Sequence, residues 1–177
     1  MKSVRLLAVA LIATGLGVLL TYERVTEIVI SKSARSLVAY AADGKVVMSV
    51  PIGLGRAPEG HKHREGDQRT PEGEYYVCFR NPQSRYRLSL GLSYPNPQDA
   101  ARGRAEGAID DAEYAAIVEA HRRREIPPWK TALGGEIFIH GRLEEHDVTA
   151  GCVAIRDRDI DALFPLVAIG TRVRIVP

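Results

Sequence analysis

Two short apolar runs constrain the fold of this chain more than any other feature, because each one meets a turn that carries a reactive side chain. The run at residues 137–139 ends at His140. The run at residues 153–155 begins directly after Cys152. Short runs of strand-favouring residues bounded by glycine are typical of strand ends, where a rigid sheet holds loop residues in fixed positions. The sequence therefore predicts two strand ends that present a nucleophile and its base.

This pair of side chains suits acyl transfer through a thioester. A free thiol has a pKa of about 8.5 and is only a few per cent thiolate at neutral pH, so a neighbouring imidazole is needed to take its proton. Gly151 tolerates a positive φ, which lets consecutive backbone N–H groups point at one developing oxyanion. We therefore expect Cys152 to be the nucleophile, His140 the general base and Gly151 a backbone oxyanion donor.

The same segment resembles the signature of the L,D-transpeptidase catalytic domain family (YkuD; ErfK/YbiS/YcfS/YnhG), in which an apolar strand ends in His-Gly and a later Ser/Thr-x-Gly-Cys carries the nucleophile. Residues 66–77, residues 89–96 and the tail at 159–177 also resemble the family. The resemblance covers the chain from about residue 26 to residue 177. It implies a mainly β fold of the β-rich α+β class. The expected architecture is an L,D-transpeptidase-like β-sandwich with short helices.

The motif departs from its commonest form at three points. Ala150 stands where that form has a second histidine, and Ala154 stands where it has Arg or Asn. The spacing from His140 to Thr149 is also shorter. All three differences resemble a branch of the family that reads Thr-x-Gly-Cys-Val/Ile-Ala. The arginine that binds the substrate carboxylate is then missing from its usual place, and Arg156 is a candidate substitute.

The resemblance implies a reaction on peptidoglycan stem peptides without a cofactor. Enzymes of the family attack the amide between an L-centre and a D-amino acid, typically diaminopimelate and a terminal D-Ala, and pass the acyl group from cysteine to an amine. That amine belongs to another stem or to a wall-attached protein. If water accepts the acyl group instead, the same thioester gives carboxypeptidase or amidase activity. A catalytically silent wall-binding module is the alternative outside catalysis. The candidate substrate-binding residues are Tyr94, Thr149, Arg156 and Trp129.

The N-terminal segment differs from the rest of the chain. Lys2 and Arg5 precede an uncharged apolar run at residues 6–22, and about 17 to 25 such residues can span a bilayer. No small-x-small cleavage site follows Leu20. We expect residues 1–24 to form an apolar helix that anchors residues 25–177 on the periplasmic side of the inner membrane. A cleaved signal segment, which gives a secreted protein, and a buried helix of a cytosolic protein are the alternatives.

Residues 25–177 have the length and composition of one folded domain. The net charge of +2 provides no basic stripe, which excludes nucleic acid as a partner. Period-two and helical patterns locate the main elements, and Asp43-Gly44 is a hairpin signal. The predicted elements are two or three strands in residues 27–54, strands at 74–80 and 172–176, and helices at 109–124 and 159–168.

The helix at 109–124 belongs to an insert at about residues 99–130 relative to shorter members of the family. Its arginine run, 122–124, is expected to be a solvated helix end, with an anionic substrate or a phospholipid surface as the alternative. The insert ends in Pro127, Pro128 and Trp129 just before the strand that carries His140. We expect the turn with Trp129 to form a lid that restricts water at the thioester.

Several reactive side chains have more than one interpretation. Cys78 is either a small buried side chain or the disulfide partner of Cys152. His61 and His63 are interpreted as solvated loop residues, with metal ligands as the less favoured alternative.

A metal hydrolase built on His140, His146 and Cys152 is a minor alternative, because the His-x5-His spacing is unusual for zinc. Asp147 in the same loop is interpreted mainly as a loop cap, with orientation of the cysteine turn as the alternative.

Overall fold

The computed structural model describes residues 24–143 and 147–177. The predicted N-terminal apolar helix, with its apolar run at residues 6–22, lies outside these ranges, and so does His146. In the part of the chain that is described, none of the helices has the length and apolar character needed to cross a bilayer.

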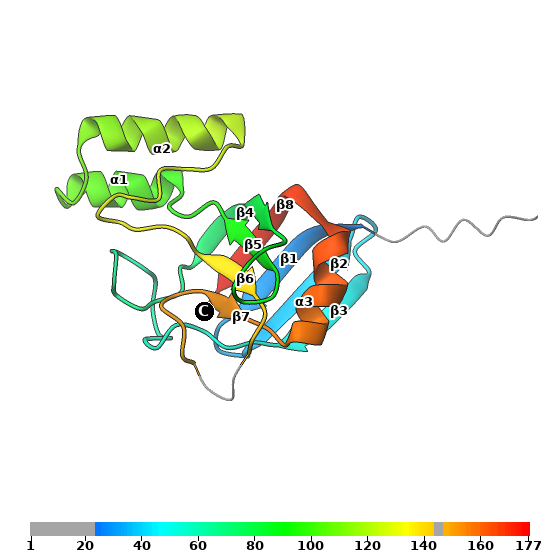
Figure 1. Ribbon diagram of the computed structural model, residues 1–177. Coiled ribbons are helices and arrows are strands. Elements are labelled where there is room, and N and C mark those ends of the chain that lie inside the picture. The colour runs from blue at the N-terminus through cyan, green and yellow to red at the C-terminus, as the bar shows by residue number, and fades with distance from the viewer. Residues whose placement is uncertain (1–23, 144–146) are drawn as a thin grey trace, which may run out of the picture.

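The described residues form one curled sheet of eight strands, in the order β3-β2-β1-β8-β4-β5-β6-β7 (Figure 1). Pairing is parallel between β1 and β8 and between β6 and β7, and antiparallel between the other neighbours. The strands are β1 (Val25–Ser31), β2 (Ser36–Ala41), β3 (Val46–Pro51), β4 (Gly73–Asn81), β5 (Ser89–Leu92), β6 (Phe138–His140), β7 (Val153–Ala154) and β8 (Val167–Val176). The mainly β class expected from the sequence is confirmed.

Strand β4 joins the two halves of this sheet. Its residues 73–76 pair with β8, and its residues 77–81 pair with β5. The central strand predicted at 74–80 is therefore confirmed. The expected sandwich differs in one respect: its halves are one continuous sheet that curls, because β4 hydrogen-bonds to both of them.

The N-terminal half of the sheet follows the sequence closely. The Asp43-Gly44 turn joins β2 to β3, as predicted. The Lys45 N–H donates to Asp43 Oδ1 at 3.1 Å, and Gly44 has φ +82°. Strand β8 then enters between β1 and β4, so the C-terminal segment closes the centre of the sheet.

Apolar side chains from both halves of the sheet fill the inside of the curl in one cluster. Complete burial of a Leu or Ile side chain contributes about 1.5–3 kcal/mol each. Among the largest fully buried members are Ile28, Ile30, Leu37, Leu54, Leu90, Leu92, Ile139 and Ile155. Ile139 and Ile155 belong to the two predicted apolar runs, so the core fixes both sides of the candidate site.

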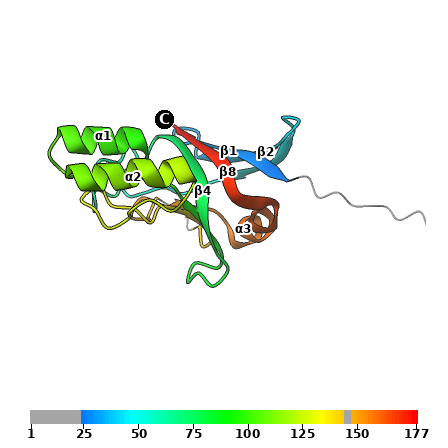
Figure 2. The same cartoon turned by 90° about the horizontal axis from the view of Figure 1, so that it is seen from above.

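Two helices lie between β5 and β6, at one end of the sheet beside β4 (Figures 1 and 2). α2 (Asp111–Arg123) corresponds to the helix predicted at 109–124, with Asp110 as its N-cap. α1 (Pro97–Ala105) was not predicted, because it buries small residues rather than an apolar stripe. Its Gly103 packs so closely that an added Cβ would lie 2.6 Å from a Leu133 methyl.

The C-terminal segment forms α3 (Asp157–Leu163), a short 3-10 helix (Phe164–Leu166) and β8. The predicted helix at 159–168 ends earlier, because Pro165 lies in the 3-10 turn and the chain becomes extended at Val167. The final strand is correspondingly longer than the predicted strand at 172–176. Ile160 and Leu163 face the core, as expected.

Candidate active site

Cys152 follows a turn that accommodates only glycine. Gly151 has φ +131°, and a Cβ atom there would lie 2.7 Å from the Arg69 carbonyl oxygen. On the same side, a Cβ added to Gly55 would lie 3.1 Å from the Gly151 Cα and 2.0 Å from the Gln68 carbonyl oxygen. The nucleophile turn is therefore packed against the backbone of two segments of the connection between β3 and β4.

The Thr149 hydroxyl braces this turn from within. Thr149 Oγ1 donates to the Cys152 carbonyl at 2.8 Å and accepts the Gly151 N–H at 3.1 Å. The Gly151 N–H, expected to face an oxyanion, is thus already used. Within the described residues the Cys152 N–H makes no hydrogen bond, so it is the donor that the turn leaves open.

His140 ends β6 in a defined tautomer. Its Nδ1 lies 2.6 Å from the Gly141 carbonyl oxygen, and because a carbonyl only accepts, Nδ1 carries the proton. The Nε2 lone pair remains, and Nε2 has no hydrogen-bond partner among the described residues. The ring stacks on Tyr86, with centroids 4.5 Å apart and planes inclined by 23°. The imidazole is therefore oriented with its basic nitrogen free.

The pairing of β6 with β7 places the two candidate catalytic residues on one face of the sheet. Ile139 pairs with Val153, and His140 pairs with Ala154, in parallel register. Side chains alternate along a strand, and Ile139 and Val153 point into the core. His140 and Cys152 consequently share the opposite face as diagonal neighbours.

Burial controls the protonation of both groups. It raises the pKa of the Cys152 thiol, while the Phe138 N–H and the positive charges of Lys62 and Arg85 act against it. Burial likewise lowers the pKa of His140, and the Arg85 charge lowers it further, although the bond to Gly141 opposes both. At neutral pH the site therefore holds a neutral thiol and a neutral imidazole. In this state the sulfur donates to the Glu136 carbonyl at 3.6 Å.

Three neighbours of this site were not identified from the sequence. Lys62 is buried, and its Nζ lies 2.9 Å from both Asp67 Oδ1 and a backbone carbonyl. Arg85 and Tyr86 come from the loop between β4 and β5. None of the three belongs to a motif, because each reaches the site through packing of a distant loop.

The predicted substrate-binding residues lie in different settings. Tyr94 is fully buried, and its hydroxyl donates to the Leu133 carbonyl at 3.0 Å, so it is a core residue and its expected substrate contact is wrong. Arg156 is exposed at the start of α3. The role of Arg156 stays a prediction.

Trp129 is packed against two aromatic side chains, and its role as a lid stays a prediction. Its ring packs edge-to-face on Phe79 and Phe138, with centroids 6.5 and 5.6 Å away. The preceding helices dock elsewhere, where the Tyr76 hydroxyl of β4 donates to the Glu125 carbonyl at 2.7 Å. The insert therefore approaches the nucleophile through the segment after α2, which ends at Glu136.

Both cysteines are free thiols, so the alternative of a Cys78–Cys152 disulfide is wrong. Cys78 is buried in β4 and donates to the Gly91 carbonyl at 3.4 Å, and burial raises its pKa to about 12. Its interpretation as a small buried side chain is confirmed. Asp147 accepts the Leu54 N–H at 2.7 Å and pairs with Arg35 at 2.6 Å, which confirms its interpretation as a loop cap.

His61 is not a solvated loop residue, and that expectation is wrong. Its Nδ1 accepts the Glu72 N–H at 2.9 Å, and its Nε2 lies 2.7 Å from Asp99 Oδ1. His63 is exposed, as expected. Among the described residues, no three His, Cys, Asp or Glu side chains are arranged to hold a metal ion.

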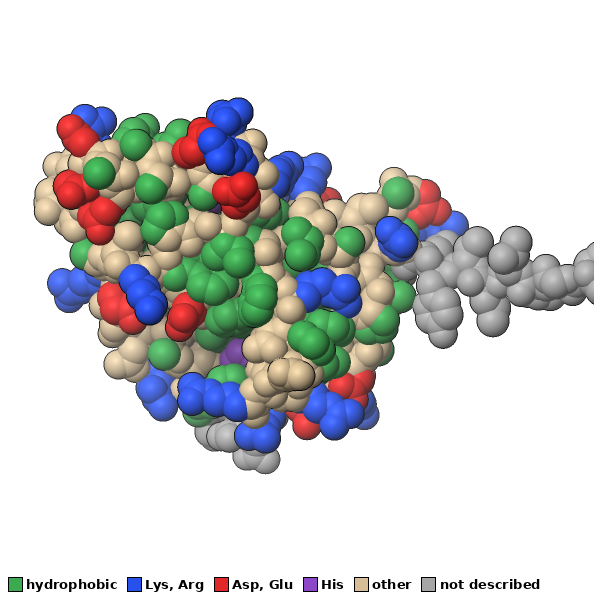
Figure 3. Space-filling model, turned by 45° about the horizontal axis from the view of Figure 1, so that its top comes forward, with side chains coloured by type: hydrophobic (Ala, Val, Ile, Leu, Met, Phe, Trp, Pro, Cys, Tyr) green, Lys and Arg blue, Asp and Glu red, His purple; other side chains and the backbone are tan. Residues whose placement is uncertain are grey.

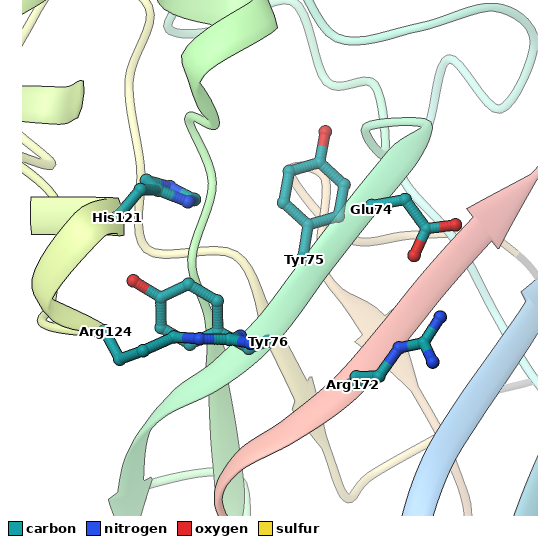
Figure 4. A pocket seen from close by; sticks show the side chains of 6 residues that line it. All are labelled: Glu74, Tyr75, Tyr76, His121, Arg124 and Arg172. Atoms are coloured by element: carbon teal, nitrogen blue, oxygen red, sulfur yellow. The ribbon is translucent and has the colours of Figure 1, made fainter.

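The molecular surface has hollows on more than one side. Figure 3 shows a histidine at the bottom of a hollow between apolar side chains, with basic side chains on its rim. A separate open pocket of about 400 Å³ lies between α2, β4 and β8 (Figure 4). Its lining residues are Glu74, Tyr75, Tyr76, His121, Arg124 and Arg172, and none of them was predicted as a site residue.

Comparison with known proteins identifies the fold and the family. The model of the YkuD L,D-transpeptidase catalytic domain matches residues 25–175. The chain belongs to this family. The recognition made from the His140 and Cys152 segments is therefore confirmed.

Three similar proteins were found, one by sequence and two by fold. YafK of Escherichia coli K12, named for an inferred L,D-transpeptidase activity, is 29% identical over 111 residues, which are 61% of this chain and 32% of YafK. The helical cell shape determining protein Pgp2 of Campylobacter jejuni matches with TM-score 0.59 and 24% identity, over 87% of this chain and 48% of Pgp2. Bd1075 of Bdellovibrio bacteriovorus matches with TM-score 0.55 and 22% identity, over 87% of this chain and 48% of Bd1075. The two structural likenesses concern the fold, and the chain spans about a third of YafK.

Proposed function

We propose that the protein is a cysteine-dependent L,D-transpeptidase that acts on peptidoglycan stem peptides. The observation that carries the proposal is the geometry of His140. Its Nδ1 proton is committed to a carbonyl, which leaves a free Nε2 on the face of the sheet that also carries Cys152. Membership of the L,D-transpeptidase family supports the substrate class.

In the acylation step His140 Nε2 takes the Cys152 proton while the sulfur bonds to the carbonyl carbon of an L-centre. The Cys152 N–H stabilises the oxyanion that forms. Collapse breaks the amide C–N bond, and His140 returns the proton to the leaving amine of the D-amino acid. General acid–base help of this kind contributes about 10² to 10⁴ in rate.

In the second step an acceptor amine attacks the thioester. His140 takes a proton from the attacking amine, the C–S bond breaks, and the thiol is restored. The acceptor is an amine on another stem or on a wall-attached protein.

Hydrolysis is the second candidate, because one observation favours it. The Cys152 side chain is partly exposed, and Trp129 packs against Phe79 and Phe138. A thioester in this setting is open to water, and water gives an L,D-carboxypeptidase or an amidase. A silent wall-binding module is disfavoured by the free base and thiol.

The location proposed for this activity is the periplasm, where the substrate lies. The apolar run at residues 6–22, preceded by Lys2 and Arg5, supports an anchor in the inner membrane. Retention of the full-length chain in membranes after an alkaline carbonate wash is the expected result. Recovery of a shortened soluble form would show that the segment is cleaved.

Mass spectrometry of the products from a defined tetrapeptide muropeptide tests the proposal. Cross-linked dimer with release of D-Ala is expected, whereas tripeptide alone identifies the hydrolase. Cys152→Ala is the matched control and yields neither product. Absence of all products from the wild-type protein would refute both enzymatic candidates.

A further inference from the structure

Arg85 contacts the aromatic ring that stacks on the proposed base. Its guanidinium carbon is 4.8 Å from the centroid of the Tyr86 ring. That ring in turn stacks on His140 at 4.5 Å between centroids. The Tyr86 carbonyl accepts the Gly141 N–H at 3.0 Å, so the loop is tied to the end of β6. The backbone of Tyr86 is thus fixed beside His140, and the Arg85 guanidinium lies over the Tyr86 ring.

The charge of Arg85 has no acidic partner among the described residues, although the side chain is exposed. Arg87 in the same loop differs, because it forms a two-pronged ion pair with Asp161 at 2.9 and 2.8 Å. A guanidinium that lies over an aromatic ring can still donate through its N–H groups, and these match a carboxylate in a two-pronged bond. Arg85 therefore offers an open anion-binding edge.

Arg85 also differs from the other positive charges around Cys152. Its field acts on both catalytic candidates and lowers the pKa of each. Lys62 acts on Cys152 alone, and it is buried and paired with Asp67. An anion bound at Arg85 would lie beside Tyr86, the ring that stacks on His140.

We propose that Arg85 binds a carboxylate of the stem peptide and is the residue that supplies the positive charge absent at Ala154. The inference rests on the proposed function. Two carboxylates of the substrate have this chemistry: the C-terminal carboxylate of the leaving D-amino acid and the side-chain carboxylate of diaminopimelate.

Binding to a protein that cannot react tests this role independently of turnover. Dissociation constants are measured in the Cys152→Ala background for three peptides: the tetrapeptide, its C-terminal amide, and a tetrapeptide with lysine in place of diaminopimelate. Adding Arg85→Ala is expected to raise the dissociation constant of the tetrapeptide by about 10- to 100-fold, because a hydrogen bond to a charged group is lost. For the peptide that already lacks the carboxylate bound by Arg85, the same substitution should change the dissociation constant by at most about twofold. Whichever peptide behaves in this way therefore identifies the carboxylate that Arg85 binds.

Arg87→Ala is the matched control, because it removes an arginine of the same loop that is already paired. It should leave all three dissociation constants within about twofold, and Arg85→Lys should retain part of the affinity. Equal weakening of all three peptides by Arg85→Ala, or no weakening, would overturn the role. Loss on Arg156→Ala instead would transfer the role to that residue. Turnover by the wild-type protein separately decides the proposed function.

Discussion

The loops at His61 and His140 hold an imidazole in two different ways. At His61 both ring nitrogens are used, one by the Glu72 N–H and one by the Asp99 carboxylate. At His140 only Nδ1 is used, by a carbonyl, and Nε2 remains open. A histidine whose two ring nitrogens are both hydrogen-bonded has a structural role. A histidine with a proton fixed on one ring nitrogen can accept a second proton on the other.

The surroundings of the two histidines differ in the same sense. Asp99 is buried beside His61, and it also accepts the Tyr75 hydroxyl at 3.2 Å and the Asn96 N–H at 2.9 Å. A buried carboxylate needs such partners, and they connect a loop, β4 and α1. Around His140 the nearby charge of Arg85 is exposed and unpaired within the described chain. One region is satisfied internally, and the other is completed by a ligand.

The largest effect is expected for Cys152→Ala. Turnover should be abolished, because no other side chain at this position forms a thioester. The free energy of unfolding should change little, since the side chain lies in a turn outside the core. Cys78→Ala is the matched control: it should keep turnover and lower the free energy of unfolding by about 1 kcal/mol. Turnover assays and chemical denaturation measure these two quantities. Normal turnover by Cys152→Ala would contradict the proposed mechanism.

His140→Asn should lower kcat/KM by about 10² to 10⁴, because the general base is lost. Circular dichroism and thermal unfolding should show that the fold persists. A loss below tenfold in a folded variant would mean that another group deprotonates Cys152.

The pH profile should show a plateau bounded by the two shifted groups. His140 acts as a base only when neutral, and burial lowers its pKa below 6.5. Thus kcat/KM should fall only below pH 6.5, eventually about tenfold per pH unit. Burial raises the pKa of Cys152 above 9.0, so the alkaline limit should lie above that value. A fall of kcat/KM on the acid side that is centred above pH 6.5 would contradict a resting site with a neutral imidazole and a neutral thiol.

His61→Asn should reverse the pattern of His140→Asn. It removes the His61 contact to the buried Asp99 Oδ1, so the free energy of unfolding should fall by about 1–3 kcal/mol. The kcat/KM of the folded protein should stay within about twofold. Urea denaturation and steady-state assays measure both, and a loss of activity comparable to His140→Asn would remove the distinction between the two regions.

The smallest effect is expected for Glu136→Gln. The negative charge of Glu136 raises the pKa of Cys152, so its removal lowers that pKa and raises the thiolate fraction. Alkylation by iodoacetamide at pH 8 should become about two- to threefold faster, because the carboxylate is exposed and screened. A slower reaction would have the wrong sign for this electrostatic account.

The parts of the fold and site that the sequence predicted are those with a local signal. The β2–β3 turn, strand β4 and helix α2 show turn residues or periodic apolar positions. Cys152 and His140 were found because each follows or precedes an apolar run at a glycine-containing turn. Helix α1 was missed because its contact with Leu133 depends on a distant residue.

The remaining features depend on contacts between segments far apart in the sequence. No local pattern separates Arg85, which stacks over Tyr86, from Arg87, which pairs with Asp161. From the sequence, Tyr94 is an aromatic residue next to a turn. Its complete burial follows from the packing of the core, which the sequence pattern does not reveal.

Trapping of the acyl-enzyme tests the central claim most directly. The wild-type protein is mixed with a carbapenem or a defined tetrapeptide, quenched in acid, and weighed intact before peptide mapping. One acyl adduct on the peptide that contains Cys152, with none on the peptide that contains Cys78, is the predicted result. Turnover without any adduct at Cys152, or with the adduct on another residue, would contradict the account.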